Sequence, residues 1–428
     1  MREFVTSETT LTVIMIATGL VTAGVWGITW WFTRTITRFV PPEVDDAELP
    51  RFHVFMPLRG ADPFLKDAIH SVLDQDYPDL KLYIVLDSDA DPAFDIVQSV
   101  VESRGDPRAT VEIIQNRDPG RSLLCSGLLQ VLDRVRHEEA LLTFAGGDEV
   151  QHRAWLRLMG SALNDPEVCA TLGNRWYVPE AGWFGSLVRC WWNYWAVIHM
   201  RLNDVPWGGT LALRIQDVIR SGLDQKWATG MVEDAPARDV LRHLGMKFQF
   251  VPRLMIINRE ETDLSSVYRF IARQTLWTRL YHSGWVQALF ATLGGQLVSL
   301  MYFGHLALGV STRAWESLLI SQTCHLLVYA SVVMSYQMLD RAIRRQPGYD
   351  DEAANEWGTG RSIQLALTMA LSLPVMLTAS IQGILTRRIR WRGVEYQIDA
   401  PFRVRMLNYQ PFTQSAVDGA AAASIDPS

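Results

Sequence analysis

Four long uncharged segments constrain this chain more than any other feature of its sequence. Residues 9–33, 284–312, 317–339 and 362–386 contain no Lys, Arg, Asp or Glu. A helix needs about 20 apolar residues to cross the hydrocarbon core of a bilayer, and each segment reaches that length. We therefore predict an integral membrane protein with membrane helices near both ends of the chain.

The first segment is either an uncleaved anchor or a signal peptide. Its apolar run is long, and the aromatic residues at 30–32 are typical of an interfacial belt, which favours the anchor. Arg34 and Arg38 follow this segment, whereas Arg2 alone precedes it. Because positive charge gathers on the cytoplasmic side, we expect the large region that follows to lie in the cytoplasm.

That polar region is long enough for one α/β domain. Short apolar strands alternate there with amphipathic helices, as in "FHVFMPL" before "DPFLKDAIHSVLDQDY" and "LKLYIVLD" before "PAFDIVQSVVESRG". This alternation predicts a mainly parallel, doubly wound sheet. Ligands of such sheets bind beyond the carboxyl ends of the strands, and acidic residues occur at those ends in this sequence.

The predicted organisation has six parts: a membrane anchor at 1–40, a linker at 41–50, a cytoplasmic α/β domain at 51–265, an interfacial amphipathic helix at 266–283, membrane helices at 284–386, and a basic, then disordered, tail at 387–428. Three full crossings in the late segments would place the tail outside the cell. An interfacial or re-entrant helix at Pro374 would keep it inside, and the sequence leaves both arrangements open.

Composition excludes two classes of protein. The net charge is -6, and no basic stripe with interleaved aromatic residues is present, so nucleic acid is not an expected partner. Four cysteines show no metal-ligand spacing, which argues against a zinc site or a disulfide framework: Cys125, Cys169, Cys190 and Cys324.

Two strand ends carry candidate site residues. "VLDSDADP" places Asp87, Asp89 and Asp91 directly after a strand; they form a solvated turn that caps the next helix, or Asp87 binds the nucleoside of a nucleotide sugar with the other two in support. "FAGGDEV" places Asp148 alone at a second strand end, behind Gly146.

The order of these motifs resembles the ceramide glucosyltransferase family and its lipid-directed relatives among the inverting family-two-type glycosyltransferases. The resemblance is carried by "MPLRGADPF", "DQDYPDLKLYIVLDSDADPAFDIV", "VED", "RQTLW" and "IRWRGVEY", in that order along the chain. It implies a GT-A fold, which is a Rossmann-like nucleotide-diphospho-sugar domain, between an N-terminal anchor and a C-terminal membrane bundle. It also implies transfer of a hexose, glucose first, from a UDP-sugar to a lipid hydroxyl with inversion.

By this resemblance, Asp234 of "VED" is the catalytic base, and Glu233 orients the site. Taken alone, the two acids fit a helix N-terminus equally well. Asp148 would hold Mg²⁺ or Mn²⁺ at the donor diphosphate, although Gly146 stands where the family has another acid, which weakens the metal site. A single carboxylate is still compatible with Mg²⁺, which takes further ligands from water and phosphate.

Three further segments have both a structural and a functional explanation. Gly208 and Gly209 form either a tight turn or a close approach of the backbone to the sugar. The helix with Arg273 and Trp277 is either a basic interfacial helix or the segment that closes the site over the diphosphate, and Leu276 replaces an arginine of the family motif. The Trp-rich stretch 183–200 is either core or membrane surface near the lipid entrance.

The expected protein is thus a membrane glycosyltransferase with a cytoplasmic site. Its acceptor is a ceramide-like lipid, with a hopanoid or a glycerolipid as alternatives, and its oligomeric state is open. A processive polysaccharide synthase is disfavoured because its channel needs a larger membrane bundle. A non-catalytic lipid-binding relative, which has lost metal and phosphate ligands, is the remaining alternative.

Overall fold

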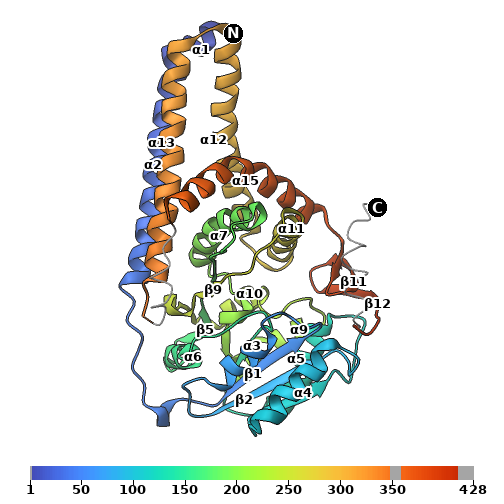
Figure 1. Ribbon diagram of the computed structural model, residues 1–428. Coiled ribbons are helices and arrows are strands. Elements are labelled where there is room, and N and C mark those ends of the chain that lie inside the picture. The colour runs from blue at the N-terminus through green and yellow to red at the C-terminus, as the bar shows by residue number, and fades with distance from the viewer. Residues whose placement is uncertain (1, 348–357, 413–428) are drawn as a thin grey trace.

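A computed structural model of the protein describes residues 2–347 and 358–412. A broad α/β domain lies below a tall bundle of helices, with the N-terminus at the far end of the bundle (Figure 1). The bundle comprises α1 (Arg2–Thr6), α2 (Glu8–Thr37), α12 (Trp285–Thr312) and α13 (Trp315–Arg344). Within the residues that the structure describes, three helices are long and apolar enough to cross a membrane, namely α2, α13 and α15 (Thr359–Leu385).

Large apolar side chains cover the outside of the bundle. Leu20 of α2 is 70% exposed, and Leu319 and Leu326 of α13 are 71% and 68% exposed. Apolar surface of this extent on a folded protein marks contact with a membrane or a partner. The structure therefore supports the predicted association with a membrane.

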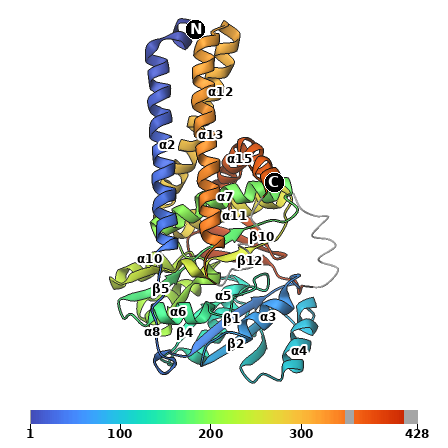
Figure 2. The ribbon, with the colours of Figure 1, turned by 60° about the vertical axis from the view of Figure 1, so that its left-hand side comes forward.

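Helix α15 does not extend the bundle. It runs across α7 (Phe184–Asn203) and α11 (Leu264–Tyr281), crosswise to α2 and α13 (Figure 1). It lies near α7 and α11, well below the end of the bundle that carries the N-terminus (Figure 2). Gly383 permits this contact, because a Cβ there would lie 2.3 Å from the carbonyl oxygen of Ala272 in α11. After α15 the chain returns to the α/β domain, where its last strands join the apolar core.

The central sheet has seven strands in the order β3-β2-β1-β4-β7-β5-β8, and all neighbouring strands are parallel except at β7. Its strands are β1 (Phe52–Leu58), β2 (Leu80–Leu86), β3 (Ala109–Ile113), β4 (Leu141–Phe144), β5 (Val168–Leu172), β7 (Ala212–Arg214) and β8 (Lys247–Phe250). The helices of the domain are α3 (Leu65–Leu73), α4 (Pro92–Arg104), α5 (Leu123–Val135), α6 (Trp155–Leu163), α8 (Ile215–Ser221), α9 (Leu223–Trp227) and α10 (Ala237–Leu241). The predicted mainly parallel α/β sheet is confirmed.

Successive residues of each inner strand point to opposite faces of the sheet and contribute to two apolar cores, one on each face. Val54 of β1 packs with α3, α4 and α6, whereas Phe55 packs with α5 and α9. Helix boundaries follow local chemistry: Ser122 caps α5 by accepting a hydrogen bond from the backbone N–H of Cys125 at 3.1 Å. A separate short sheet pairs β6 (Arg175–Tyr177) with β9 (Ile256–Asn258), and β9 lies between β5 and α7 (Figure 1).

The prediction of a basic tail did not include a second, C-terminal sheet. Strands β10 (Arg388–Trp391), β11 (Val394–Ala400) and β12 (Arg403–Asn408) form it, and Val394, Tyr396 and Ile398 join the apolar core with α5 and α11. These side chains alternate with less buried ones along β11, so one face of the sheet is apolar and packs against the core of the domain. The disorder predicted for the chain end at 416–428 lies outside the described residues.

Candidate active site

A polar cavity of about 250 Å³ lies at the carboxyl ends of β1, β2 and β4. This is the edge at which ligands of doubly wound sheets bind. Five of the predicted site residues contribute to its wall: Asp87, Asp148, Gly208, Gly209 and Glu233. The alternation of strands and helices therefore brings together residues that are far apart in the sequence.

Asp87 is buried at the end of β2, with 1% of its surface exposed. Arg59 donates a hydrogen bond to its Oδ2, and the Nε of Arg117 lies 3.6 Å from its Oδ1. Oδ1 has no hydrogen-bond partner within the described part of the chain. An unsatisfied buried acceptor in a cavity wall is costly unless a ligand supplies the missing donor.

The other two acids of this turn do not reach the cavity. Asp91 caps α4: its Oδ1 accepts hydrogen bonds from the backbone N–H groups of Ala93 at 2.9 Å and Gly60 at 3.1 Å. Asp89 is exposed at the turn. The structural explanation of the turn thus holds for Asp91, and only Asp87 faces the cavity.

After β4, the chain places two acids beside one arginine. Asp148 is 37% exposed, and its Oδ2 lies 3.6 Å from Nη1 of Arg175. Glu149, which is buried, forms an ion pair with the same guanidinium group. Burial raises the pKa of Glu149 to about 7, although Arg175 opposes the shift. Glu149 also lines the cavity.

Gly208 and Gly209 each lie very close to a carboxyl group, that of Glu233 and that of Glu149 respectively. A Cβ at Gly208 would lie 2.2 Å from Oε1 of Glu233, and one at Gly209 would lie 2.5 Å from Oε2 of Glu149. The indole N–H of Trp155 donates to the carbonyl of Gly209 at 3.0 Å and fixes this segment. The glycines are therefore required by close approach and not only by a turn.

Glu233 and Asp234 stand at the junction of two cavities. Glu233 lines the polar cavity, whereas Asp234 lines a second, mostly apolar cavity of about 580 Å³. Trp207 belongs to the walls of both, and Arg175 lies over its ring at 4.6 Å. This arrangement joins a polar ligand site to an apolar one across a pair of carboxyl groups.

The pKa values of both acids are raised. Burial is the main cause of the raised pKa of Glu233, and the neighbouring Asp234 adds to it. Burial also raises the pKa of Asp234, against hydrogen bonds that its carboxylate accepts from the N–H groups of Gly208 at 3.0 Å and Ala235 at 2.5 Å. A carboxylate with a raised pKa is a stronger base than an ordinary one, which suits proton abstraction.

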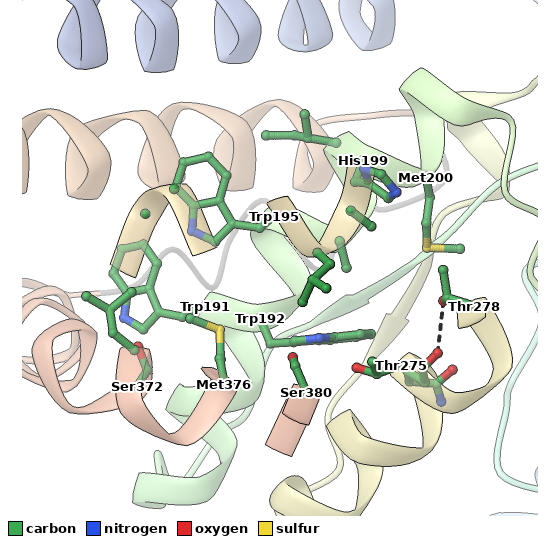
Figure 3. Close-up of a pocket in the computed structure, with 18 of the residues that line it drawn as sticks. Trp191, Trp192, Trp195, His199, Met200, Thr275, Thr278, Ser372, Met376 and Ser380 are labelled. Carbon is green, nitrogen blue, oxygen red and sulfur yellow. Dashed lines mark hydrogen bonds between the residues drawn. The ribbon is translucent and has the colours of Figure 1, made fainter. Parts of the chain in front are cut away.

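The apolar cavity extends from Asp234 between α7, α11 and α15 into the helix bundle. Figure 3 shows Trp191, Trp192 and Trp195 of α7 on one side of it, with Met376 and Ser380 of α15 opposite. Trp191 also belongs to the core, where its indole N–H donates to the carbonyl of Leu365 in α15 at 2.9 Å. The Trp-rich helix thus packs in the core, which is the first alternative considered for it, and also lines the apolar cavity.

Helix α11 carries Arg273 and Trp277 to the site in different ways. Trp277 lines the apolar cavity, and its ring centroid lies 6.2 Å from that of Trp391 in the polar cavity wall. Burial lowers the pKa of Arg273, and the neighbouring charges of Arg392 and Arg175 add to the shift. Arg273 therefore belongs to a group of arginines around Asp148, although it lines neither cavity.

Leu276, which replaces an arginine of the family motif, and Arg279, the next arginine along α11, both face away from the polar cavity. Leu276 is fully buried in the core between α11, α5 and the C-terminal sheet. Arg279 donates a hydrogen bond to the carbonyl of Thr386 at 3.0 Å, outside the cavity. Neither position supplies charge to the polar cavity.

Asp148 is the residue best suited to hold a divalent cation. Within residues 2–347 and 358–412, no three His, Cys, Asp or Glu side chains are grouped as metal ligands. Asp62 is engaged by Arg392 and Glu149 by Arg175, whereas Asp148 lies 3.6 Å from the same Arg175 and is partly exposed. The donor set fits a cation that takes its remaining ligands from water and phosphate oxygens.

Several cavity residues were not predicted from the sequence. They are Arg59, Asp62, Trp207, Trp391, Arg392 and Tyr396. Arg59 and Asp62 belong to the segment "LRGAD" that supported the family resemblance, so the motif itself was the available signal. Trp391, Arg392 and Tyr396 lie in "IRWRGVEY", whose contribution depends on the return of the chain after α15.

Comparison with known proteins supports the class predicted from the sequence, a glycosyltransferase. The sequence profile described as "Glycosyl transferase family 21" matches residues 11–169. A ceramide glucosyltransferase of Komagataella phaffii is 30% identical over 70 residues, which span 16% of this chain and 13% of that protein. The match to this relative therefore covers about an eighth of its length.

The chain is also similar in structure to two solved proteins, a mannosyltransferase and a glucosyl-3-phosphoglycerate synthase. A mannosyltransferase of Pyrobaculum calidifontis, in complex with GDP-Man and Mn²⁺, is 17% identical with a TM-score of 0.45, covering 88% of this chain and 99% of that one. Glucosyl-3-phosphoglycerate synthase of Mycobacterium tuberculosis, in complex with Mn²⁺, UDP and glucosyl-3-phosphoglycerate, is 14% identical with a TM-score of 0.37, covering 57% and 88%.

The predicted enzyme class is confirmed by the profile match: residues 11–169 carry the sequence of a glycosyltransferase. The segment that matches the profile begins in α2 and ends in β5. The predicted resemblance to ceramide glucosyltransferases is thereby confirmed for this part of the chain. The α/β fold class, with apolar helices at the N-terminus and in the C-terminal region, is confirmed as well.

Proposed function

We propose that this protein transfers a hexose, with glucose as the first candidate, from a UDP-sugar to the hydroxyl group of a ceramide-like lipid, with inversion at the anomeric carbon. The observation that carries the proposal is the junction of the two cavities at Glu233 and Asp234. A polar cavity suits a nucleotide sugar, and an apolar cavity that opens toward membrane helices suits a lipid.

In this mechanism the lipid enters the apolar cavity, and its hydroxyl group reaches Asp234. The carboxylate accepts the hydroxyl proton while the oxygen attacks the anomeric carbon. The new C–O bond forms as the bond to the diphosphate oxygen breaks, so the sugar is inverted and UDP leaves with the electron pair. Asp87 binds the nucleoside, Glu233 orients the site, and Arg273 with Trp277 closes it.

The developing charge on the diphosphate needs positive partners. Mg²⁺ or Mn²⁺ bound at Asp148 would neutralise phosphate charge when the donor is present. Arg175 lies beside Asp148 and over the ring of Trp207, which belongs to the walls of both cavities. Such preorganised charges stabilise a leaving group more strongly inside a protein than in water.

We further propose a multi-pass protein whose α/β domain faces the cytoplasm, as the arginines that follow α2 predict. The acceptor would then come from the inner leaflet. An apolar cavity lined by tryptophans favours a lipid over a growing polysaccharide, whose hydroxyl groups require a polar channel. Hopanoids and glycerolipids share the required chemistry, an apolar body with a hydroxyl group, and remain alternative acceptors.

The test is transfer by the purified full-length protein in detergent with Mg²⁺ or Mn²⁺. UDP-glucose and other UDP-sugars are each paired with ceramide, diacylglycerol and a hopanoid, and products are identified by mass spectrometry. Nuclear magnetic resonance of the product then reports the anomeric configuration, which should be inverted relative to the donor. Binding of lipid without transfer or hydrolysis of any UDP-sugar would support the non-catalytic alternative.

A further inference from the structure

The C-terminal sheet brings a guanidinium group into the wall of the polar cavity. Arg392 lies in the turn between β10 and β11, and its two Nη atoms lie 2.9 and 3.0 Å from the two carboxylate oxygens of Asp62. Trp391 and Tyr396 of the same sheet also line the cavity. One side of the candidate donor site is therefore built from the end of the chain.

Arg59 fixes this turn relative to the residue assigned to the nucleoside. Its Nε donates to the carbonyl of Arg392 at 2.6 Å, and its Nη2 donates to the carbonyl of Gln410 at 2.7 Å. The remaining Nη1 forms the ion pair with Asp87. A single side chain thus holds the backbone of Arg392 beside the buried carboxylate of Asp87.

The side chain of Arg392 is available to a ligand. It is 44% exposed and lines the cavity, and its partner Asp62 is 17% exposed. Asp148, the residue suited to a cation, contributes to the electrostatic environment of both. Neither Leu276 nor Arg279 supplies charge to this cavity, whereas the guanidinium group of Arg392 lies in its wall.

We propose that Arg392 binds the diphosphate of the nucleotide-sugar donor, exchanging the carboxylate of Asp62 for phosphate oxygens when the donor enters. A guanidinium group binds phosphate oxygens in the same bidentate geometry in which it binds a carboxylate, so the exchange needs little movement. This inference rests on the proposed function, because it requires a nucleoside diphosphate in the polar cavity.

The test compares binding of UDP and uridine to the full-length protein by calorimetry, with and without Mg²⁺. Arg392→Gln is expected to weaken UDP binding roughly ten- to hundredfold, as loss of a charge-assisted bond does, and to leave uridine binding unchanged. The matched control is Arg390→Gln, because Arg390 is exposed on the same β10 strand and lines neither cavity. Equal UDP affinity of Arg392→Gln and the wild type would overturn the inference.

A double variant separates phosphate binding from the ion pair. If Arg392 serves only to neutralise Asp62, Asp62→Asn with Arg392→Gln will regain the wild-type affinity for UDP, and the inference fails. If Arg392 binds phosphate, the double variant stays as weak as Arg392→Gln. Should Arg392→Gln not fold, Arg392→Lys replaces it; Lys keeps the charge without the bidentate geometry, so weaker UDP binding supports the inference and wild-type affinity overturns it.

The two proposals fail in different ways. A wild-type protein that binds neither UDP nor uridine would contradict the proposed function, and this inference with it. A wild-type protein that binds UDP, together with an Arg392→Gln variant that binds it equally well, would contradict this inference alone.

Discussion

Glu233 and Asp234 are neighbours in the chain, yet they line different cavities. Glu233 lies in the wall of the polar cavity and Asp234 in the wall of the apolar one, with Trp207 shared between the two walls. A lipid hydroxyl group at the end of the apolar cavity would therefore meet Asp234 first. This relationship is why we assign proton abstraction to Asp234 and orientation of the site to Glu233.

Asp234→Asn should lower kcat by about 10²–10⁴-fold, the usual contribution of a general base. The affinity for UDP should change little, because Asp234 faces the acceptor cavity and the amide oxygen can still accept a hydrogen bond. Initial rates and UDP binding check this, with exposed Asp95→Asn in α4 as the control. Unchanged kcat in Asp234→Asn would remove this residue from the mechanism.

As the pH is lowered, the rate should begin to fall at a higher pH than it would if Asp234 had the pKa of an ordinary aspartate. The pKa of Asp234 is raised by burial, and only its charged form accepts a proton. As pH decreases through this raised pKa, the protonated fraction increases and kcat/KM decreases. A profile of kcat/KM against pH tests this, and a rate that stays constant down to about pH 4, the ordinary range of aspartate, would contradict it.

Gly208→Ala should lower kcat by roughly 10²-fold through displacement of the carboxyl group of Glu233. The added Cβ would lie 2.2 Å from Oε1 of Glu233, so this side chain must move, and small displacements in an active site are costly. Gly24→Ala in α2 is the matched control, since a Cβ there meets no atom within 4 Å. Rates of both variants and their melting temperatures distinguish a local effect from general destabilisation.

Leu276→Arg should not restore function, even though it recreates the family motif. The side chain is fully buried in the domain core, so an unpaired charge there should destabilise the protein by about 3–5 kcal/mol. Thermal or denaturant unfolding in detergent measures this, with Leu276→Met as the control. Improved UDP binding in a stable Leu276→Arg protein would show that α11 can turn this face toward the donor.

Ala370→Trp should raise the KM for the lipid acceptor by roughly tenfold, since overpacking costs on the order of 1–3 kcal/mol. Ala370 of α15 lines the apolar cavity, so a larger side chain there competes with the lipid for space. The next residue, Leu371, is 59% exposed and does not line the cavity, which makes Leu371→Trp the matched control. Equal effects of both substitutions on KM would place the acceptor elsewhere.

Local sequence patterns were sufficient to predict the α/β domain. The apolar runs of β1, β2 and β4 and the caps at Asp91 and Ser122 depend on neighbouring residues, so their signals are visible in short windows. The same logic placed Asp87 and Asp148 at strand ends on one edge of the sheet.

Other features depended on contacts between distant segments. Periodicity gives the length of α15 but not its direction, which follows from packing against α7 and α11. The roles of Arg392 and Leu276 likewise depend on which way their elements face after the chain has folded back. A motif comparison counts an arginine as missing at position 276, whereas the cavity contains one from position 392.

The return of the chain to the α/β domain has a consequence for biosynthesis. Trp391, Arg392 and Tyr396 complete the wall of the polar cavity, and they follow α15 in the chain. A nascent chain synthesised only as far as α13 therefore still lacks part of this wall. If the cavity binds the proposed donor, the site is complete only after the last apolar helix and the strands that follow it have been made.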